Sequence, residues 1–161
     1  MVGFMGSGKS TVGRRLAAMI HFRFADTDDE IEAGAHARVA DIFRERGEAG
    51  FRELERQTIS DLLNGDRCVI ATGGGAFAEA ACAEDLLARS FTVYLSCDFD
   101  EAFRRAASLG GRPLLDRGET GAAALYAERK AKYSRAHVAV ETTHRSPDEV
   151  VSDILRLLPR P

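Results

Sequence analysis

The sequence predicts a three-layer α/β/α fold in which a parallel, five-stranded central sheet lies between helices. Short apolar runs alternate along the chain with longer segments of helical periodicity, which is the order expected of strands joined by crossover helices. A chain of 161 residues that is 45% hydrophobic also suits one domain with one core. We therefore expect a single domain over residues 1–161.

Four of the expected strands are short apolar runs, each followed by polar residues or glycines. They span residues 22–25, 68–71, 91–95 and 138–141. The first strand is the exception, because only Met1 and Val2 precede a glycine-rich loop, whereas a normal strand has about 5–6 residues. We expect either that the natural chain starts further upstream or that this protein has kept little of its first strand.

The expected helices carry apolar residues at intervals of three and four positions. The apolar face of the first helix consists of Val12, Leu16, Met19 and Ile20. A helix from Val39 is expected to stop near Gly47, and a longer helix follows it up to residue 64. The last helix begins with a capping box formed by Ser146 and Glu149.

The segment 109–121 interrupts this alternation. It contains four glycines and Pro113, so neither a helix nor a strand is expected there. Long loops inside compact domains are often lids over a site, and we expect a mobile lid here.

Composition and charge exclude several classes of protein. The formal net charge of −3 lacks the basic surface that nucleic-acid binders usually carry, and no run approaches the roughly 18 apolar residues of a membrane span. The three cysteines, Cys68, Cys82 and Cys97, form no CxxC pair and have no zinc-site spacing. We therefore expect reduced thiols in a cytoplasmic protein, without nucleic-acid or membrane partners.

A phosphate-binding loop is the most specific motif. Residues 3–10 fit G-x-x-x-x-G-K-[ST] at every fixed position, and an amphipathic helix follows, which disfavours a chance glycine-rich turn. The glycines let backbone N–H groups point at a phosphate, Lys9 reaches the outer phosphates, and the Ser10 hydroxyl ligates Mg²⁺. The loop predicts a nucleotide but no particular reaction. A GTPase would also need an N-K-x-D motif, which the sequence lacks.

Two aspartates follow the strand at 22–25. Asp26 and Asp28 would lie at the carboxyl edge of a parallel sheet, where ligands bind. One carboxylate there can hold magnesium and the other can accept a proton from an attacking hydroxyl. The alternative is a helix cap, in which Asp28 and its acidic neighbours charge the first turn of the next helix.

Other candidate residues are ambiguous when taken singly. Arg52 can grip a carboxylate beside Phe51, although the pattern alone favours a surface ion pair with Glu55. The glycines at 73–75 end a strand, where each costs stability and packing does not require them, so they predict the close approach of a ligand to the backbone. Arg112, in the expected lid, is either a mobile arginine that reaches transferring phosphates or an exposed loop residue.

Together these motifs resemble the shikimate kinase family, a P-loop kinase type related to the nucleoside monophosphate kinases. The resemblance runs almost end to end. It rests on residues 6–11, 26–28, 42–43, 47–48, 51–52, 72–76, 93–95 and 112–115, and on Arg129 before Tyr133. It implies a monomer that uses ATP and Mg²⁺ to phosphorylate the 3-hydroxyl of shikimate, in the biosynthesis of aromatic amino acids.

The resemblance also implies roles for individual residues. Lys9, Asp28 and Arg112 would be catalytic, with Asp28 placed to take the proton from the 3-hydroxyl, and Asp26 would hold Mg²⁺ through water alongside Ser10. The implied nucleotide-binding residues are Gly6, Ser7, Gly8, Lys9, Ser10, Thr11, Arg105, Arg112 and Arg145. The implied shikimate-binding residues are Asp28, Arg52, Gly73, Gly74, Gly75 and Arg129, with residues 28–64 as the substrate-binding helical region.

Two other functions fit parts of the pattern. A kinase of another small sugar acid or of a nucleotide would accept gluconate or a nucleoside monophosphate and reject shikimate. A kinase-like binding module would hold a ligand without turnover. The presence of Lys9, Ser10, Asp26, Asp28 and Arg112 together argues against the binding module.

Overall fold

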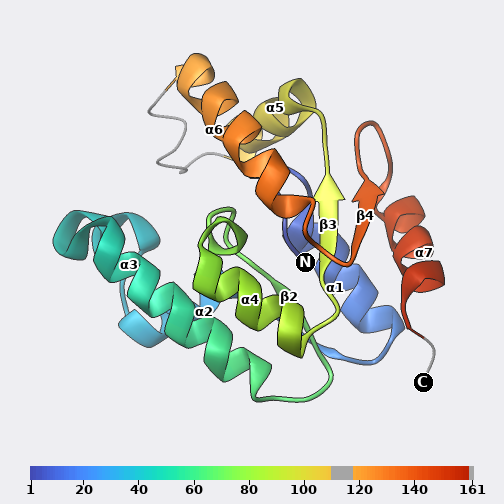
Figure 1. Cartoon of the computed structure of the whole chain (residues 1–161), viewed down its shortest axis with the longest axis horizontal. Helices are drawn as coiled ribbons and strands as arrows, with labels where there is room; N and C mark the ends of the chain where they lie inside the picture. Colours follow the sequence, from blue (N-terminus) through green and yellow to red (C-terminus); the bar gives the residue numbers. More distant parts are fainter. Residues whose placement is uncertain (110–117, 160–161) are drawn as a thin grey trace.

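The computed structural model describes residues 1–109 and 118–159 (Figure 1). The elements that it describes are, in chain order, α1 (Lys9–Met19), β1 (Arg23–Asp26), α2 (Thr27–Ala35), α3 (Val39–Leu63), β2 (Cys68–Ala71), the 3₁₀ turn η1 (Ala76–Ala78), α4 (Ala80–Arg89), β3 (Val93–Ser96), α5 (Phe99–Leu109), α6 (Gly118–Tyr133), β4 (Val138–Glu141) and α7 (Pro147–Leu157).

The described strands form two parallel pairs, β1 with β2 and β3 with β4. Met1 and Val2 lie between the pairs. On one side Thr72 N–H donates to the Met1 carbonyl at 3.1 Å, and on the other Val2 N–H donates to the Val93 carbonyl at 2.9 Å. Val2 also forms a parallel bridge with Tyr94. The expected five-stranded sheet is therefore present in the described residues as four strands in two pairs, joined by this two-residue segment.

Two apolar clusters lie on opposite faces of β3, because successive strand residues point to opposite sides. Val93 and Leu95 belong to a cluster formed with α1 and α7. Tyr94 belongs to a second cluster, which includes Ile59 of α3, Leu86 of α4 and Tyr133 of α6. This arrangement of helices on both faces agrees with the expected three layers (Figure 1).

The helix α3 is bent at Gly47, where φ is 67° and ψ is −179°. The sequence correctly predicted an interruption at this residue, although the chain re-enters a helix immediately after it. Ile42 before the kink and Phe51 after it pack with Ile31 of α2 in a small apolar cluster of their own. The two arms of α3 and the helix α2 thus form one unit beside the sheet.

Three predictions about the elements need correction or fall outside the structure. Met19, assigned to the apolar face of α1, is 59% exposed. Gly118 and Gly121 were expected in a loop but belong to α6, whose first residue, Gly118, has a φ of 70° that glycine adopts readily. The rest of the expected lid, residues 110–117 with Arg112, lies outside the described residues. The capping box of Ser146 and Glu149 is confirmed at the start of α7.

Among residues 1–109 and 118–159, no helix is both long and apolar enough to cross a membrane. The same residues contain no group of three or more His, Cys, Asp or Glu side chains that could hold a metal ion on their own. The cysteines at 68, 82 and 97 are free thiols.

Candidate active site

The phosphate loop adopts a conformation that only glycine accepts readily. Gly6 has a φ of 74° and Gly8 a φ of 93°, in the left-handed region. A Cβ atom on Gly6 would also lie 2.0 Å from the Ala102 carbonyl oxygen. The Lys9 ammonium is nearly buried and donates to the carbonyls of Gly3 and Phe4, each at 2.9 Å. Because Lys9 opens α1, the positive end of the helix dipole faces the same loop.

Ser10 and Asp26 meet at the carboxyl end of β1. The Ser10 hydroxyl donates to one Asp26 oxygen at 2.6 Å, and the other oxygen accepts the Asp28 backbone N–H at 3.1 Å. Asp26 is thus the N-cap of α2, and Asp28 and its acidic neighbours lie in the first turn of that helix, as the helix-cap alternative predicted. A hydroxyl and a carboxylate side by side are also the oxygen donors that Mg²⁺ prefers. These two residues therefore fit the magnesium site expected from the sequence.

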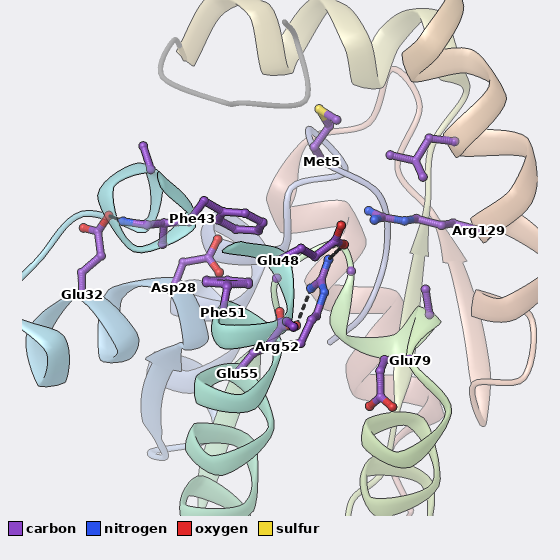
Figure 2. A pocket seen from close by; sticks show the side chains of 18 of the residues that line it. Met5, Asp28, Glu32, Phe43, Glu48, Phe51, Arg52, Glu55, Glu79 and Arg129 are labelled. Carbon is purple, nitrogen blue, oxygen red and sulfur yellow. Dashed lines mark hydrogen bonds and ion pairs between the residues drawn. The ribbon is translucent and has the colours of Figure 1, made fainter. Parts of the chain in front are cut away.

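A cavity of about 1180 Å³ opens beside the phosphate loop, between the α2–α3 unit and α6 (Figure 2). Met5 of the loop lines it, so the cavity reaches the place where phosphates would bind. Asp28 and Phe43 lie on one side, and Arg129 reaches in from the opposite side (Figure 2). The predicted substrate residues that line this cavity are Asp28, Arg52, Gly73, Gly74, Gly75 and Arg129.

Arg52 and Glu55 form a buried ion pair, which corrects the prediction that this pair lies on the surface. The Glu55 side chain is 1% exposed, and its Oε2 accepts from Arg52 Nη1 at 2.5 Å. Arg52 also pairs with the exposed Glu48 at 3.4 Å. Burial raises the pKa of Glu55 above its usual range, although Arg52 opposes this effect. The second oxygen, Oε1, is buried and has no hydrogen-bond partner among the described residues.

Charged side chains approach the glycine segment 73–75 very closely. A Cβ atom on Gly75 would lie 2.3 Å from Arg52 Nη2, and one on Gly73 would lie 2.6 Å from Glu55 Oε1 and 2.9 Å from Asp28 Oδ1. The groups that approach this backbone in the structure are the site's own side chains, and the close approach of a ligand stays a prediction.

Thr27 ties the two aspartates to the glycine segment. Its hydroxyl, which is fully buried, accepts the Gly73 N–H at 2.8 Å. This contact holds the end of β1 against the end of β2, so that Asp28 faces the cavity from the first turn of α2. Sequence reasoning missed the role of Thr27; its position between Asp26 and Asp28 was the available signal.

Arg105 and Arg145 converge at the carboxyl end of β4, away from the cavity lining. Arg105 donates to the Thr142 carbonyl at 3.0 Å and pairs with Glu101 at 2.8 Å. Arg145 donates to the Glu141 carbonyl at 3.1 Å and pairs with Asp153 at 2.7 Å. Both guanidinium groups thus lie at one strand end.

Comparisons with known proteins identify the family. The family model described as shikimate kinase matches residues 5–159. Shikimate kinase from Chromohalobacter salexigens is 42% identical over 159 residues, which cover 97% of this chain and 88% of the relative. The Persephonella marina enzyme is 38% identical, with 96% and 94% covered. The structure of shikimate kinase from Acinetobacter baumannii in complex with shikimate matches with a TM-score of 0.93 at 36% identity, covering 97% of this chain and 89% of that one. This chain belongs to the shikimate kinase family.

Proposed function

We propose that this chain transfers the γ-phosphate of ATP to the 3-hydroxyl of shikimate, giving shikimate 3-phosphate and ADP. Membership of the family makes it an ATP-dependent kinase, and the Acinetobacter baumannii relative was solved with shikimate bound. The observation that carries the proposal is one cavity in which Arg52 and Arg129 face Asp28 beside the phosphate loop. A small acid with hydroxyl groups matches that arrangement of charges.

The carboxylate of shikimate would bind between Arg52 and Arg129. Guanidinium groups bind carboxylates through paired N–H donors, and such charged hydrogen bonds are about twice as strong as neutral ones. Glu48 and Glu55 hold the Arg52 guanidinium, so it is already oriented when the substrate enters. Part of the entropic cost of ordering that side chain is therefore met before binding.

Asp28 would take the proton of the 3-hydroxyl as that oxygen attacks the γ-phosphorus. A carboxylate in this role needs to lie within hydrogen-bond reach of the hydroxyl. Asp28 lines the cavity and lies close to Gly73, on the side opposite Arg129 (Figure 2). A substrate whose carboxylate contacts Arg129 would therefore extend its ring hydroxyls toward Asp28.

The nucleotide phosphates would bind the N–H groups of residues Gly6, Ser7, Gly8, Ser10 and Thr11. Lys9 would exchange its two carbonyl partners for phosphate oxygens, a gain because the phosphates carry full charge. Ser10 and Asp26 would hold Mg²⁺, with Asp26 acting through water; when bound, this ion neutralises charge on the phosphate oxygens. We assign Arg112 to the same phosphates and Arg105 and Arg145 to the rest of the nucleotide.

Several properties of the whole chain are part of the proposal. We propose a cytoplasmic monomer without nucleic-acid or membrane partners, in which Met1 and Val2 supply the fifth strand of the sheet. The free cysteines support a reducing compartment.

The test is an ADP-release assay with Mg-ATP and three acceptors: shikimate, gluconate and a nucleoside monophosphate. We expect turnover with shikimate alone. Turnover with either of the others, and none with shikimate, would instead support a kinase of a different small acid or of a nucleotide. Binding of shikimate without ADP release under any condition would support a binding module.

A further inference from the structure

Tyr133 occupies a junction behind the substrate cavity. It lies in α6 four residues after Arg129, so both side chains project from the same face of that helix. The ring is 1% exposed and packs against Tyr94, with the ring centroids 5.3 Å apart. The Tyr133 hydroxyl donates a hydrogen bond to the Gly74 carbonyl. This contact joins α6 to the glycine segment that lines the cavity.

Gly74 itself lies between the phosphate loop and Arg129. A Cβ atom on Gly74 would lie 3.6 Å from Met5 N, 3.7 Å from the Gly3 carbonyl oxygen and 3.7 Å from Arg129 Nη1. Gly74 therefore lies near both the phosphate loop and Arg129, with no side chain between them. A group that holds the Gly74 carbonyl in place therefore also helps to set the distance between the phosphate loop and Arg129.

The direction of the hydrogen bond between Tyr133 and Gly74 is determined by its acceptor. A carbonyl oxygen only accepts, so the Tyr133 hydroxyl donates its proton to Gly74. Burial raises the pKa of Tyr133 well above its ordinary value, although Arg129 opposes this effect. The hydroxyl therefore keeps its proton, and remains a donor, across the working pH range.

We infer that Tyr133 is a positioning residue for phosphoryl transfer, which holds the Gly74 carbonyl and the Arg129 guanidinium at a fixed spacing from the phosphate loop. The inference rests on the proposed function, because it takes Arg129 and the glycine segment as the acceptor site. A loose acceptor would sit at a variable distance from the γ-phosphate, and misplacement by about 1 Å is enough to slow such reactions strongly. Tyr133 acts only through Gly74 and Arg129 and does not itself react.

The test compares Tyr133→Phe with the matched variant Tyr94→Phe. Both remove one hydroxyl from the same pair of packed, buried tyrosines, and among the described residues it is the Tyr133 hydroxyl that hydrogen-bonds the cavity-lining segment. For Tyr133→Phe we expect kcat with shikimate to fall and the shikimate KM and Kd to rise, each by about tenfold, the usual effect of losing one or two hydrogen bonds, with the KM for Mg-ATP within about twofold of wild type. Tyr94→Phe is expected to leave both KM values near wild type.

Two outcomes would overturn the role of Tyr133 while leaving the proposed function intact. One is an unchanged shikimate KM in Tyr133→Phe; the other is an equal rise of both KM values, which indicates general loosening of the fold. A wild-type enzyme that releases no ADP with shikimate would contradict the proposed function itself. If Tyr133→Phe does not fold, a fluorinated tyrosine at position 133 keeps the ring and the hydroxyl but ionises at lower pH. The 19F chemical shift of that residue reports the pH range in which its hydroxyl ionises. The shikimate KM should rise over that range while the ATP KM stays constant; a shikimate KM that stays constant while the hydroxyl ionises would also overturn the role.

Discussion

Charged side chains lie so close to the backbone of residues 73–75 that the absence of a side chain on these glycines determines where the neighbouring groups can lie. Gly75 leaves room for the Arg52 guanidinium, and Gly73 leaves room for Glu55 and Asp28. Gly74 has more space around it, since a Cβ there would lie no closer than 3.6 Å to any other heavy atom of the described residues. The three glycines are therefore not equivalent, although they are adjacent in the sequence.

Substitution at Gly75 should displace Arg52 and weaken substrate binding. In Gly75→Ala the new methyl group overlaps the guanidinium, and the flexible arginine has to move away from Glu55. We expect the shikimate KM to rise by about tenfold or more, the cost of one or two charged hydrogen bonds, with a much smaller change in the KM for Mg-ATP. Steady-state kinetics with each substrate varied in turn measures both values.

The control for this variant is Gly34→Ala, in α2, where a Cβ atom would meet nothing within 4 Å. It should behave like the wild type in both KM values. A Gly75→Ala enzyme with a normal shikimate KM would show that Arg52 does not bind the acceptor.

At the scale of single residues, the sequence predicted chemistry better than environment. The phosphate loop is a local motif, so its residues could be assigned without the fold. The spacing of Arg52 and Glu55 predicted an ion pair. It did not predict that Glu55 is buried, because its burial depends on α6 and the glycine segment, which come much later in the chain. The prediction that Met19 is buried was wrong for the same reason, because periodicity predicts which residues share a face of a helix but not how far the neighbouring elements cover that face.

At the scale of elements, α3 shows how one residue shapes the substrate region. Gly47 adopts a φ of 67° with a ψ of −179°, a backbone region that is essentially restricted to glycine. The kink turns the first arm of α3 so that Phe43 stacks on Phe51, with ring centroids 4.5 Å apart, beside the cavity. A straight helix would carry these two aromatic rings on different parts of its surface.

Replacement of Gly47 should destabilise the protein through backbone strain alone. A Cβ atom at this position would meet nothing within 4 Å, so no side-chain clash contributes. We expect Gly47→Ala to lower the free energy of unfolding by about 1–3 kcal/mol, the usual cost of a strained conformation. Urea unfolding at equilibrium measures this change. An unchanged stability would mean that the kink is not needed in the folded state.

Element boundaries were predictable where the signal is local. The capping box at Ser146 and the break at Gly47 both agree with the structure. Gly118 was placed in a loop because glycine usually interrupts helices, yet α6 begins there, and the first position of a helix tolerates a glycine better than its interior does.

At the scale of the whole molecule, the two apolar clusters on either face of β3 join elements from the entire chain. The sequence predicted these layers because strands and helices alternate. The sheet could not be predicted fully, because two residues are too few to show a strand pattern. The place of Met1 and Val2 in the sheet is shown by backbone contacts that the sequence does not reveal, such as the hydrogen bonds to Thr72 and Val93 and the bridge to Tyr94.

The buried Glu55 should make global stability depend on pH in a defined direction. Its folded-state pKa lies above the ordinary value of 4.5, so the folded protein binds this proton more tightly than the unfolded chain does. The stabilising contribution is complete below about pH 4.5 and is lost as the pH rises through the folded-state pKa. Glu55→Gln removes this titration, so the stability of wild type relative to the variant should fall over that pH range.

Urea unfolding at several pH values measures this difference. Glu48→Gln removes an exposed carboxylate that pairs with the same arginine and serves as the control, which should follow the wild type. A wild-type stability that rises relative to Glu55→Gln over the same range would contradict the raised pKa.

The most direct test of the account is the separation of binding from chemistry in Asp28→Asn. Asparagine keeps the size of the side chain and one acceptor oxygen, but its other oxygen is replaced by an NH2 donor and it cannot take the proton of the 3-hydroxyl. If Asp28 takes that proton, we expect kcat with shikimate to fall by roughly 10²–10⁴, while the Kd for Mg-ATP and the Kd for shikimate stay within a few-fold of wild type. A near-normal kcat would remove Asp28 from the chemistry and contradict the proposed mechanism.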